Sequence, residues 1–166
     1  MKTLLVLRHA KSSWDSSAAR DFDRPLAPRG ERDGPKIGRE LKRRRIDPDL
    51  IVSSPAVRAK ATLELVSSAA GLSAGPTFNE SIYGASSAEL IKIVRHFPNE
   101  RSRAMVVGHN PGFEDLVNRL TGSNERMPTA ALACITFDVD DWADVEDDNG
   151  KLVWLITPKT LSDGKE

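Results

Sequence analysis

Three short apolar segments constrain the fold of this chain more than any other feature. They read "TLLVL" (residues 3–7), "LIV" (50–52) and "MVV" (105–107), and none of them alternates polar with apolar residues. Strands that are buried on both faces of a parallel sheet have this continuous apolar pattern, whereas strands with one face in water alternate. The three segments therefore predict the buried strands of a mainly parallel sheet.

Helix signals follow these segments along the chain. The expected cap, first helical residue and stop are Ser54, Pro55 and Gly71 after the second segment, and Asn110, Pro111 and Gly122 after the third. Further helices are predicted within residues 29–46 and 86–97. Residues 130–139 and 151–158 are two more expected strands, separated by an acidic loop with an Asn-Gly turn signal.

Strands that alternate with helices predict an α/β fold, a three-layer αβα sandwich around a mainly parallel sheet. The last two strands can add an antiparallel pair. No linker rich in Pro, Gly or Ser interrupts the 166 residues, so the sequence predicts one domain over residues 1–166.

Composition excludes several classes of protein. The chain has 24 basic and 24 acidic residues, which argues against a nucleic-acid partner. Its one cysteine, Cys134, allows no internal disulfide. Arg8 interrupts the N-terminal apolar run, and no run approaches the ~20 residues that span a bilayer. We expect a cytoplasmic monomer with no membrane partner.

Basic side chains and histidines follow the three central strands where each strand ends. Arg8 and His9 follow the first, Arg58 lies in the first turn of the helix after the second, and His109 follows the third. Ligands of α/β sheets bind beyond the carboxyl ends of the strands. Two guanidinium groups and two imidazoles near helix N-termini suit an anion with several oxygens, and phosphate fits best.

Each of these residues also has a purely structural interpretation. A histidine at a strand end is often only a hydrogen-bonding residue. An arginine in the first turn opposes the helix dipole, so Arg58 needs a compensating anion. A bound phosphate is one such anion, and a nearby carboxylate is the alternative.

The segments "LRHAKSSW", "SSPAVRAKAT" and "VVGHNPG" resemble the histidine phosphatase superfamily, which has the phosphoglycerate mutase-like fold. The resemblance is closest to its small SixA-type phosphohistidine phosphatases. It implies that His9 is the nucleophile and becomes phosphorylated, and that Arg8, Arg58 and His109 bind phosphate. It also implies that no metal or cofactor is needed, because the arginines supply the positive charge.

A proton donor for the leaving group is the least constrained part of the resemblance. The segment "NESIYGA" is similar to one in which a glutamate before a Tyr-Gly pair acts as general acid, and Glu80 is the matching residue. The competing interpretation is a loop glutamate without a role. The usual tripeptide Arg-His-Gly reads Arg-His-Ala here, and Ala10 fits only where φ is not positive. Lys11 and Asp15 also depart from the family pattern, and Asp15 is expected to point away from phosphate.

The resemblance leaves the substrate open. A chain this short has little room for a lid, which favours a phosphorylated protein that carries phosphohistidine. A small phosphoester substrate and a phosphate-binding module without turnover are the alternatives. His96 is expected to be structural, and Lys42 to Arg45 to form the basic last turn of a helix beside Asp47 and Asp49.

Overall fold

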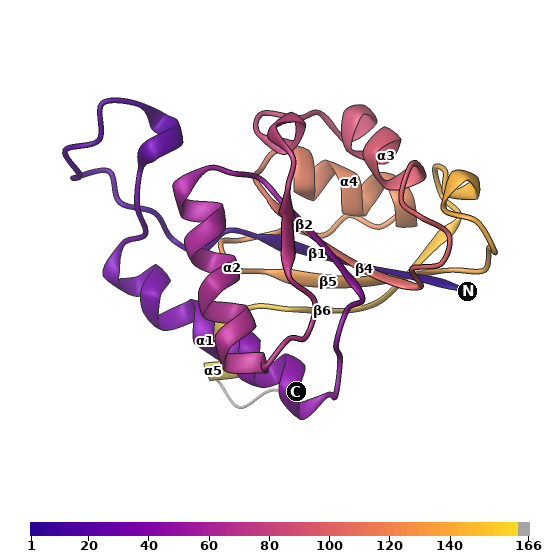
Figure 1. Cartoon of the computed structure of the whole chain (residues 1–166), viewed down its shortest axis with the longest axis horizontal. Coiled ribbons are helices and arrows are strands. Elements are labelled where there is room, and N and C mark those ends of the chain that lie inside the picture. The colour runs from indigo at the N-terminus through magenta and orange to yellow at the C-terminus, as the bar shows by residue number, and fades with distance from the viewer. Residues whose placement is uncertain (163–166) are drawn as a thin grey trace.

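A six-stranded sheet lies between two layers of helices in the computed structural model, which describes residues 1–162 (Figure 1). The elements in chain order are β1 (Lys2–Arg8), η1 (Asp21–Asp23), α1 (Pro28–Arg43), β2 (Leu50–Ser53), α2 (Val57–Ala70), β3 (Pro76–Phe78), η2 (Glu80–Ile82), α3 (Ser87–Arg95), β4 (Arg103–Gly108), α4 (Gly112–Thr121), β5 (Leu132–Phe137), η3 (Trp142–Asp144), β6 (Gly150–Ile156) and α5 (Pro158–Ser162), where η marks a short 3-10 helix. This is the α/β arrangement of three layers around a mainly parallel sheet that the sequence predicts.

The strand order is β3-β2-β4-β1-β5-β6. The pairs β1–β4, β2–β4 and β2–β3 are parallel, while β1–β5 and β5–β6 are antiparallel. This confirms a mainly parallel sheet with a final antiparallel pair. Strand β3 was not predicted, because three exposed residues at an edge carry no apolar pattern.

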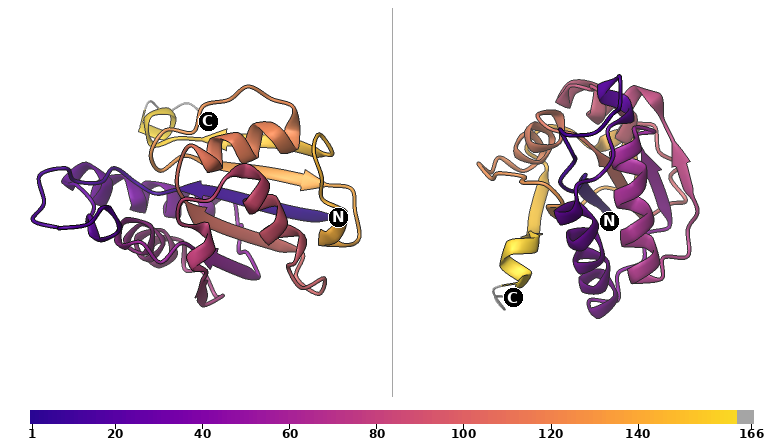
Figure 2. Two further views of the ribbon diagram at one scale, coloured as in Figure 1. Left: turned by 90° about the horizontal axis from the view of Figure 1, so that it is seen from above. Right: turned by 90° about the vertical axis from the view of Figure 1, so that its left-hand side faces the viewer.

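The two faces of the sheet bury separate apolar clusters, which the alternation along β1 makes clear. Leu4 and Val6 pack with residues of α3 and α4 on one face. Leu5 and Leu7 pack with residues of α1 and α2 on the other face. Figure 2 shows the two helical layers on opposite sides of the strands. Burial on both faces explains why the central strands read as continuous apolar runs.

The predicted helix starts after β2 and β4 are wrong by one or two residues. Helix α2 begins at Val57, and the Oγ of Ser54 accepts a hydrogen bond from the amide of Ala56 in the turn before it. Helix α4 begins at Gly112, although Oδ1 of Asn110 still accepts from the amide of Glu114. Gly71 and Gly122 end these helices with positive φ, as predicted. Ser54 thus bonds within the turn ahead of α2, whereas Asn110 accepts from the third residue of α4, as a capping side chain does.

The basic end of α1 is neutralised from within the helix. Arg43 and Arg44 both pair with the carboxylate of Glu40. The expected neighbours Asp47 and Asp49 instead accept hydrogen bonds from Ser73 and from the backbone of residues 102–103. Within residues 1–162, no helix combines the length and apolar character needed to cross a bilayer.

Candidate active site

The carboxyl ends of the central strands meet at one edge of the sheet. Arg8 at the end of β1 is in register with Gly108 at the end of β4, and Ser53 at the end of β2 is in register with Val107. The residues that follow these strands therefore emerge side by side. The structure brings Arg8, His9, Arg58 and His109 into one site, as the sequence predicts.

His9 is held in the form needed for nucleophilic attack. Its side chain is buried, and Nδ1 lies 2.7 Å from the carbonyl oxygen of Ala10. A carbonyl only accepts hydrogen bonds, so Nδ1 carries the proton and Nε2 keeps its lone pair. The amide of Ala10 donates to Oγ1 of Thr62 at 2.9 Å, and that hydroxyl donates to the carbonyl of Arg58 at 2.7 Å. The turn that orients the nucleophile is thus tied to α2.

Burial, together with the nearby His109, Arg58 and Arg8, lowers the pKa of His9 to about 3. The hydrogen bond to the carbonyl of Ala10 opposes this shift, because it favours the protonated ring. His9 is therefore neutral throughout the physiological pH range. A neutral imidazole is the form that can attack phosphorus.

Arg8 is fixed by the segment that precedes β5. Its Nη1 donates to the carbonyl of Met127 at 3.0 Å, and the side chain of Asn110 donates to the same oxygen at 2.9 Å. The amide of Met127 in turn donates to the carboxylate of Glu114 at 2.8 Å. These bonds hold the guanidinium beside His9, and no carboxylate of residues 1–162 pairs with it directly.

Arg58 is the second residue of α2 and is 6% exposed. Its Nη1 donates to the carbonyl of Asp21 at 2.8 Å, and its Nη2 lies 2.9 Å from Oδ2 of the same residue. A nearby carboxylate was the alternative to a bound phosphate as the partner of Arg58. That carboxylate is present and belongs to Asp21 in η1. The Nε of Arg58 is buried and has no partner among residues 1–162, and the charge of Arg58 lowers the pKa of both His9 and His109.

His109 completes the site opposite His9. The two imidazole centroids lie 5.2 Å apart, and Nε2 of His109 is 2.7 Å from Oγ of Ser54. Burial lowers the pKa of His109 to about 4, with Arg58 and Arg8 adding to the shift. The ring is neutral until an anion enters, and a bound phosphate dianion raises its proton affinity.

Three buried nitrogens of this site lack a partner within residues 1–162: Nε of Arg8, Nε of Arg58 and Nδ1 of His109. A buried polar atom without a hydrogen bond costs about 1–3 kcal/mol. These three nitrogens come from three different elements and gather around one nucleophile. Their placement fits a ligand that offers several oxygens at once, as a phosphoryl group does.

Among residues 1–162, Glu80 makes no hydrogen bond or ion pair with Arg8, His9, Arg58 or His109. Glu80 begins η2 and is exposed, and it lines a groove of about 780 Å³ with residues such as Leu50, Phe78 and His96. None of the residues that line this groove is Arg8, His9, Arg58 or His109. The role of Glu80 as a general acid stays a prediction.

Sequence reasoning missed two residues of the site, Asp21 and Tyr83. The hydroxyl of Tyr83 donates to Oδ2 of Asp21 at 2.6 Å, and its ring packs edge-on against His109 at 5.4 Å between centroids. Tyr83 stands in the same "YG" pair that draws attention to Glu80. Asp21 lies in an irregular loop, where no periodic pattern marks it.

The departures from the family tripeptide are accommodated. Ala10 is buried and does not have a positive φ, so its methyl group causes no backbone strain. Asp15 is exposed, and the hydroxyl of Ser13 accepts from its amide. Lys11 is half-buried at the base of the following loop.

The unfolding free energy is expected to fall as the pH drops from about 6.5 to about 4.5. His9 and His109 have folded pKa values of about 3 and about 4, below the ordinary 6.5. In this window the unfolded chain binds protons that the folded chain excludes, so acidification favours unfolding. The loss is up to about 1.4 kcal/mol per pH unit for each histidine.

Chemical denaturation at several pH values measures this slope. The His9→Asn variant should show a shallower slope, about half of the histidine contribution being lost. Equal slopes for the two proteins would contradict the burial of a neutral His9.

A model described as Histidine phosphatase superfamily (branch 1) matches residues 4–120 of the chain. An uncharacterised chloroplastic protein of Arabidopsis thaliana is 31% identical over 170 residues, which cover 95% of this chain and 78% of the relative. An uncharacterised protein of Mycobacterium tuberculosis is 31% identical over 164 residues, which cover 92% of this chain and all of the relative.

Two solved structures are also similar to this chain. The structure of the protein histidine phosphatase SixA complexed with tungstate superposes with a TM-score of 0.82 at 25% identity, covering 96% of this chain and 99% of the other. A protein assigned as the phosphohistidine phosphatase SixA of Agrobacterium tumefaciens gives a TM-score of 0.79 at 27% identity, with coverages of 95% and 98%.

Proposed function

Because the chain belongs to the histidine phosphatase superfamily, branch 1, we propose that it removes phosphate from phosphohistidine side chains of proteins through a phosphorylated His9. The observation that carries this proposal is the bond from Nδ1 of His9 to the carbonyl of Ala10. It leaves the Nε2 lone pair free among three groups that suit phosphate: Arg8, Arg58 and His109.

The first step is transfer of the phosphoryl group to His9. The Nε2 lone pair forms a bond to phosphorus while the bond from phosphorus to the leaving group breaks, and the leaving group keeps that electron pair. Charge spreads over the three equatorial oxygens in such a transfer, so positioning and positive charge supply most of the catalysis. Arg8 and Arg58 supply that charge from fixed positions.

The second step returns the enzyme to its starting state. Water attacks phosphorus, the bond from phosphorus to Nε2 breaks, and inorganic phosphate leaves. The proton stays on Nδ1, hydrogen-bonded to the carbonyl of Ala10, in both steps, so His9 re-forms with its lone pair on Nε2. The arginines supply the charge that a metal would otherwise bring, which makes a metal-independent reaction our proposal.

Two observations support phosphohistidine as the substrate class. The SixA structure with a TM-score of 0.82 is described as that of a protein histidine phosphatase. Imidazole is also a better leaving group than an alkoxide, so its release depends less on a general acid.

A substrate panel tests the proposal. Turnover of a phosphohistidine-bearing protein domain is compared with that of small phosphomonoesters, with EDTA present throughout. We expect the phosphohistidine protein to have the higher kcat/KM by at least about tenfold. Small esters that exceed it by orders of magnitude would instead favour a phosphomonoesterase, with Glu80 as its acid.

A further inference from the structure

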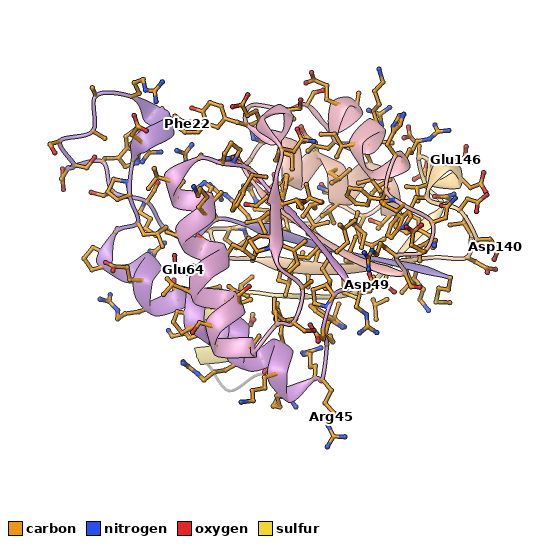
Figure 3. All side chains as sticks on the ribbon, in the orientation of Figure 1. Phe22, Arg45, Asp49, Glu64, Asp140 and Glu146 are labelled. Atoms are coloured by element: carbon orange, nitrogen blue, oxygen red, sulfur yellow. The ribbon has the colours of Figure 1, made fainter. Side chains whose placement is uncertain are left out.

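Asp21 lies at the outer, solvent-exposed rim of the site, in the loop between β1 and α1. The β1–α1 loop (residues 11–27) projects beyond the body of the molecule, and Phe22 marks it in Figure 3. The bridge between Ser12 and Leu26 closes its base. The turn η1 of this loop carries Asp21 against Arg58.

The carboxylate of Asp21 is held ionised by three donors. Oδ2 accepts from Tyr83 at 2.6 Å and from Arg58 at 2.9 Å, and Oδ1 accepts from Nε of Arg24 at 3.0 Å. The hydrogen bond from Tyr83 lowers the pKa of Asp21 most, and the bonds from Arg58 and Arg24 lower it further. An ionised carboxylate accepts about four hydrogen bonds, so Oδ1 retains capacity for one more.

The carboxylate of Asp21 is the solvent-exposed member of this site. His9 and Arg58 are each 6% exposed, whereas the Asp21 side chain is 48% exposed. His9 attacks from the buried side, and an in-line displacement places the leaving group opposite the nucleophile. The leaving group therefore emerges toward solvent, where Asp21 stands outside Arg58.

The neighbouring cations at this rim are already paired. Arg24 donates to Asp21, to Oγ of Ser12 at 2.8 Å and to the carbonyl of Ser13 at 3.1 Å, and it stacks on the ring of Trp14. Arg20 pairs with Asp23 at 3.0 Å. The rim therefore offers a carboxylate oxygen with a free acceptor position beside guanidinium groups that have partners.

We propose that Asp21 is a specificity-determining residue that favours substrates with a cationic, N–H-bearing leaving group over substrates with an anionic one. This inference rests on the proposed function, because a phosphorylated imidazole protonated on its remote nitrogen is such a leaving group. Asp21 accepts a hydrogen bond from the remote N–H. When the P–N bond breaks, its electron pair returns to the imidazole, which departs neutral with the remote proton still bound. No proton passes to Asp21.

Three small substrates separate charge from positioning. N-phosphoimidazole has the cationic leaving group, phenyl phosphate has an uncharged ring, and 4-carboxyphenyl phosphate adds one carboxylate to that ring. In the Asp21→Asn variant, we expect kcat/KM for N-phosphoimidazole relative to phenyl phosphate to fall about tenfold. In the same variant, kcat/KM for 4-carboxyphenyl phosphate relative to phenyl phosphate should rise severalfold.

Two variants serve as controls. Asp23→Asn removes the same charge from the same turn but leaves Arg58 untouched, so both ratios should stay within about twofold. Tyr83→Phe keeps the Asp21 charge and removes one hydrogen bond, so absolute rates should fall while the ratios hold. Asp21→Ser repeats the test if Asp21→Asn melts at a lower temperature than the wild type.

An equal loss for all three substrates in Asp21→Asn would overturn the inference, since Asp21 then only positions Arg58. A different result would contradict the proposed function. If the wild type does not prefer N-phosphoimidazole to phenyl phosphate, phosphohistidine is not the substrate class. The ratio of the two aryl phosphates then still decides whether Asp21 selects against anionic leaving groups.

Discussion

Replacing His9 with alanine is expected to lower kcat by at least about 10⁴-fold. The variant lacks Nε2 of His9, which keeps its lone pair because Nδ1 is bound to the carbonyl of Ala10. The remaining groups still bind phosphate, because none of them depends on the His9 side chain. Steady-state turnover and phosphate binding, measured on the same preparation, separate these two effects.

His96→Ala is the matched control for this variant. His96 also places Nδ1 2.7 Å from a backbone carbonyl, that of Lys92, but it caps the end of α3 and is exposed. Its removal should leave turnover within about twofold of the wild type. Activity that survives in His9→Ala would show that another group attacks phosphorus.

Replacing Arg58 with alanine is expected to lower kcat/KM by about 10³-fold and to weaken binding of inorganic phosphate or tungstate. Arg58 brings a buried guanidinium to the site, and its Nε has no other partner among residues 1–162. Its loss also leaves Asp21 with two donors in place of three. Kinetics and direct titration of the anion measure the two effects.

Arg58→Lys tests whether charge alone suffices. A lysine ammonium cannot reproduce the fork with which Arg58 holds Asp21 through two nitrogens, so it should recover little of the lost activity. Lys60→Ala removes an exposed cation two residues further along α2 and should leave kcat/KM unchanged. Full recovery in Arg58→Lys would contradict the need for a guanidinium at this position.

The sequence is informative wherever burial dictates a pattern. Continuous apolar runs identify β1, β2 and β4, because both faces of these strands are covered. Since parallel strands share an edge, the residues at their carboxyl ends could be placed together before any coordinates. The grouping of Arg8, His9, Arg58 and His109 follows from this reasoning.

The remainder depends on contacts that no local pattern encodes. Asp21 reaches Arg58 across 37 positions of the chain, and Tyr83 reaches Asp21 across 62. The helices after Ser54 and Asn110 begin one or two residues later than predicted, at Val57 and Gly112. Tertiary packing determines these contacts and helix boundaries, and the helix propensities of the residues do not predict them.

Trapping the phosphorylated enzyme tests the central claim most directly. The protein is mixed with a radiolabelled phosphodonor, quenched in alkali and cleaved before aspartate, which releases residues 1–14 with His9 as their only histidine. We predict an acid-labile, base-stable label on this fragment, and no label in His9→Ala. A label on another fragment, or one that persists in His9→Ala, would contradict His9 as the nucleophile.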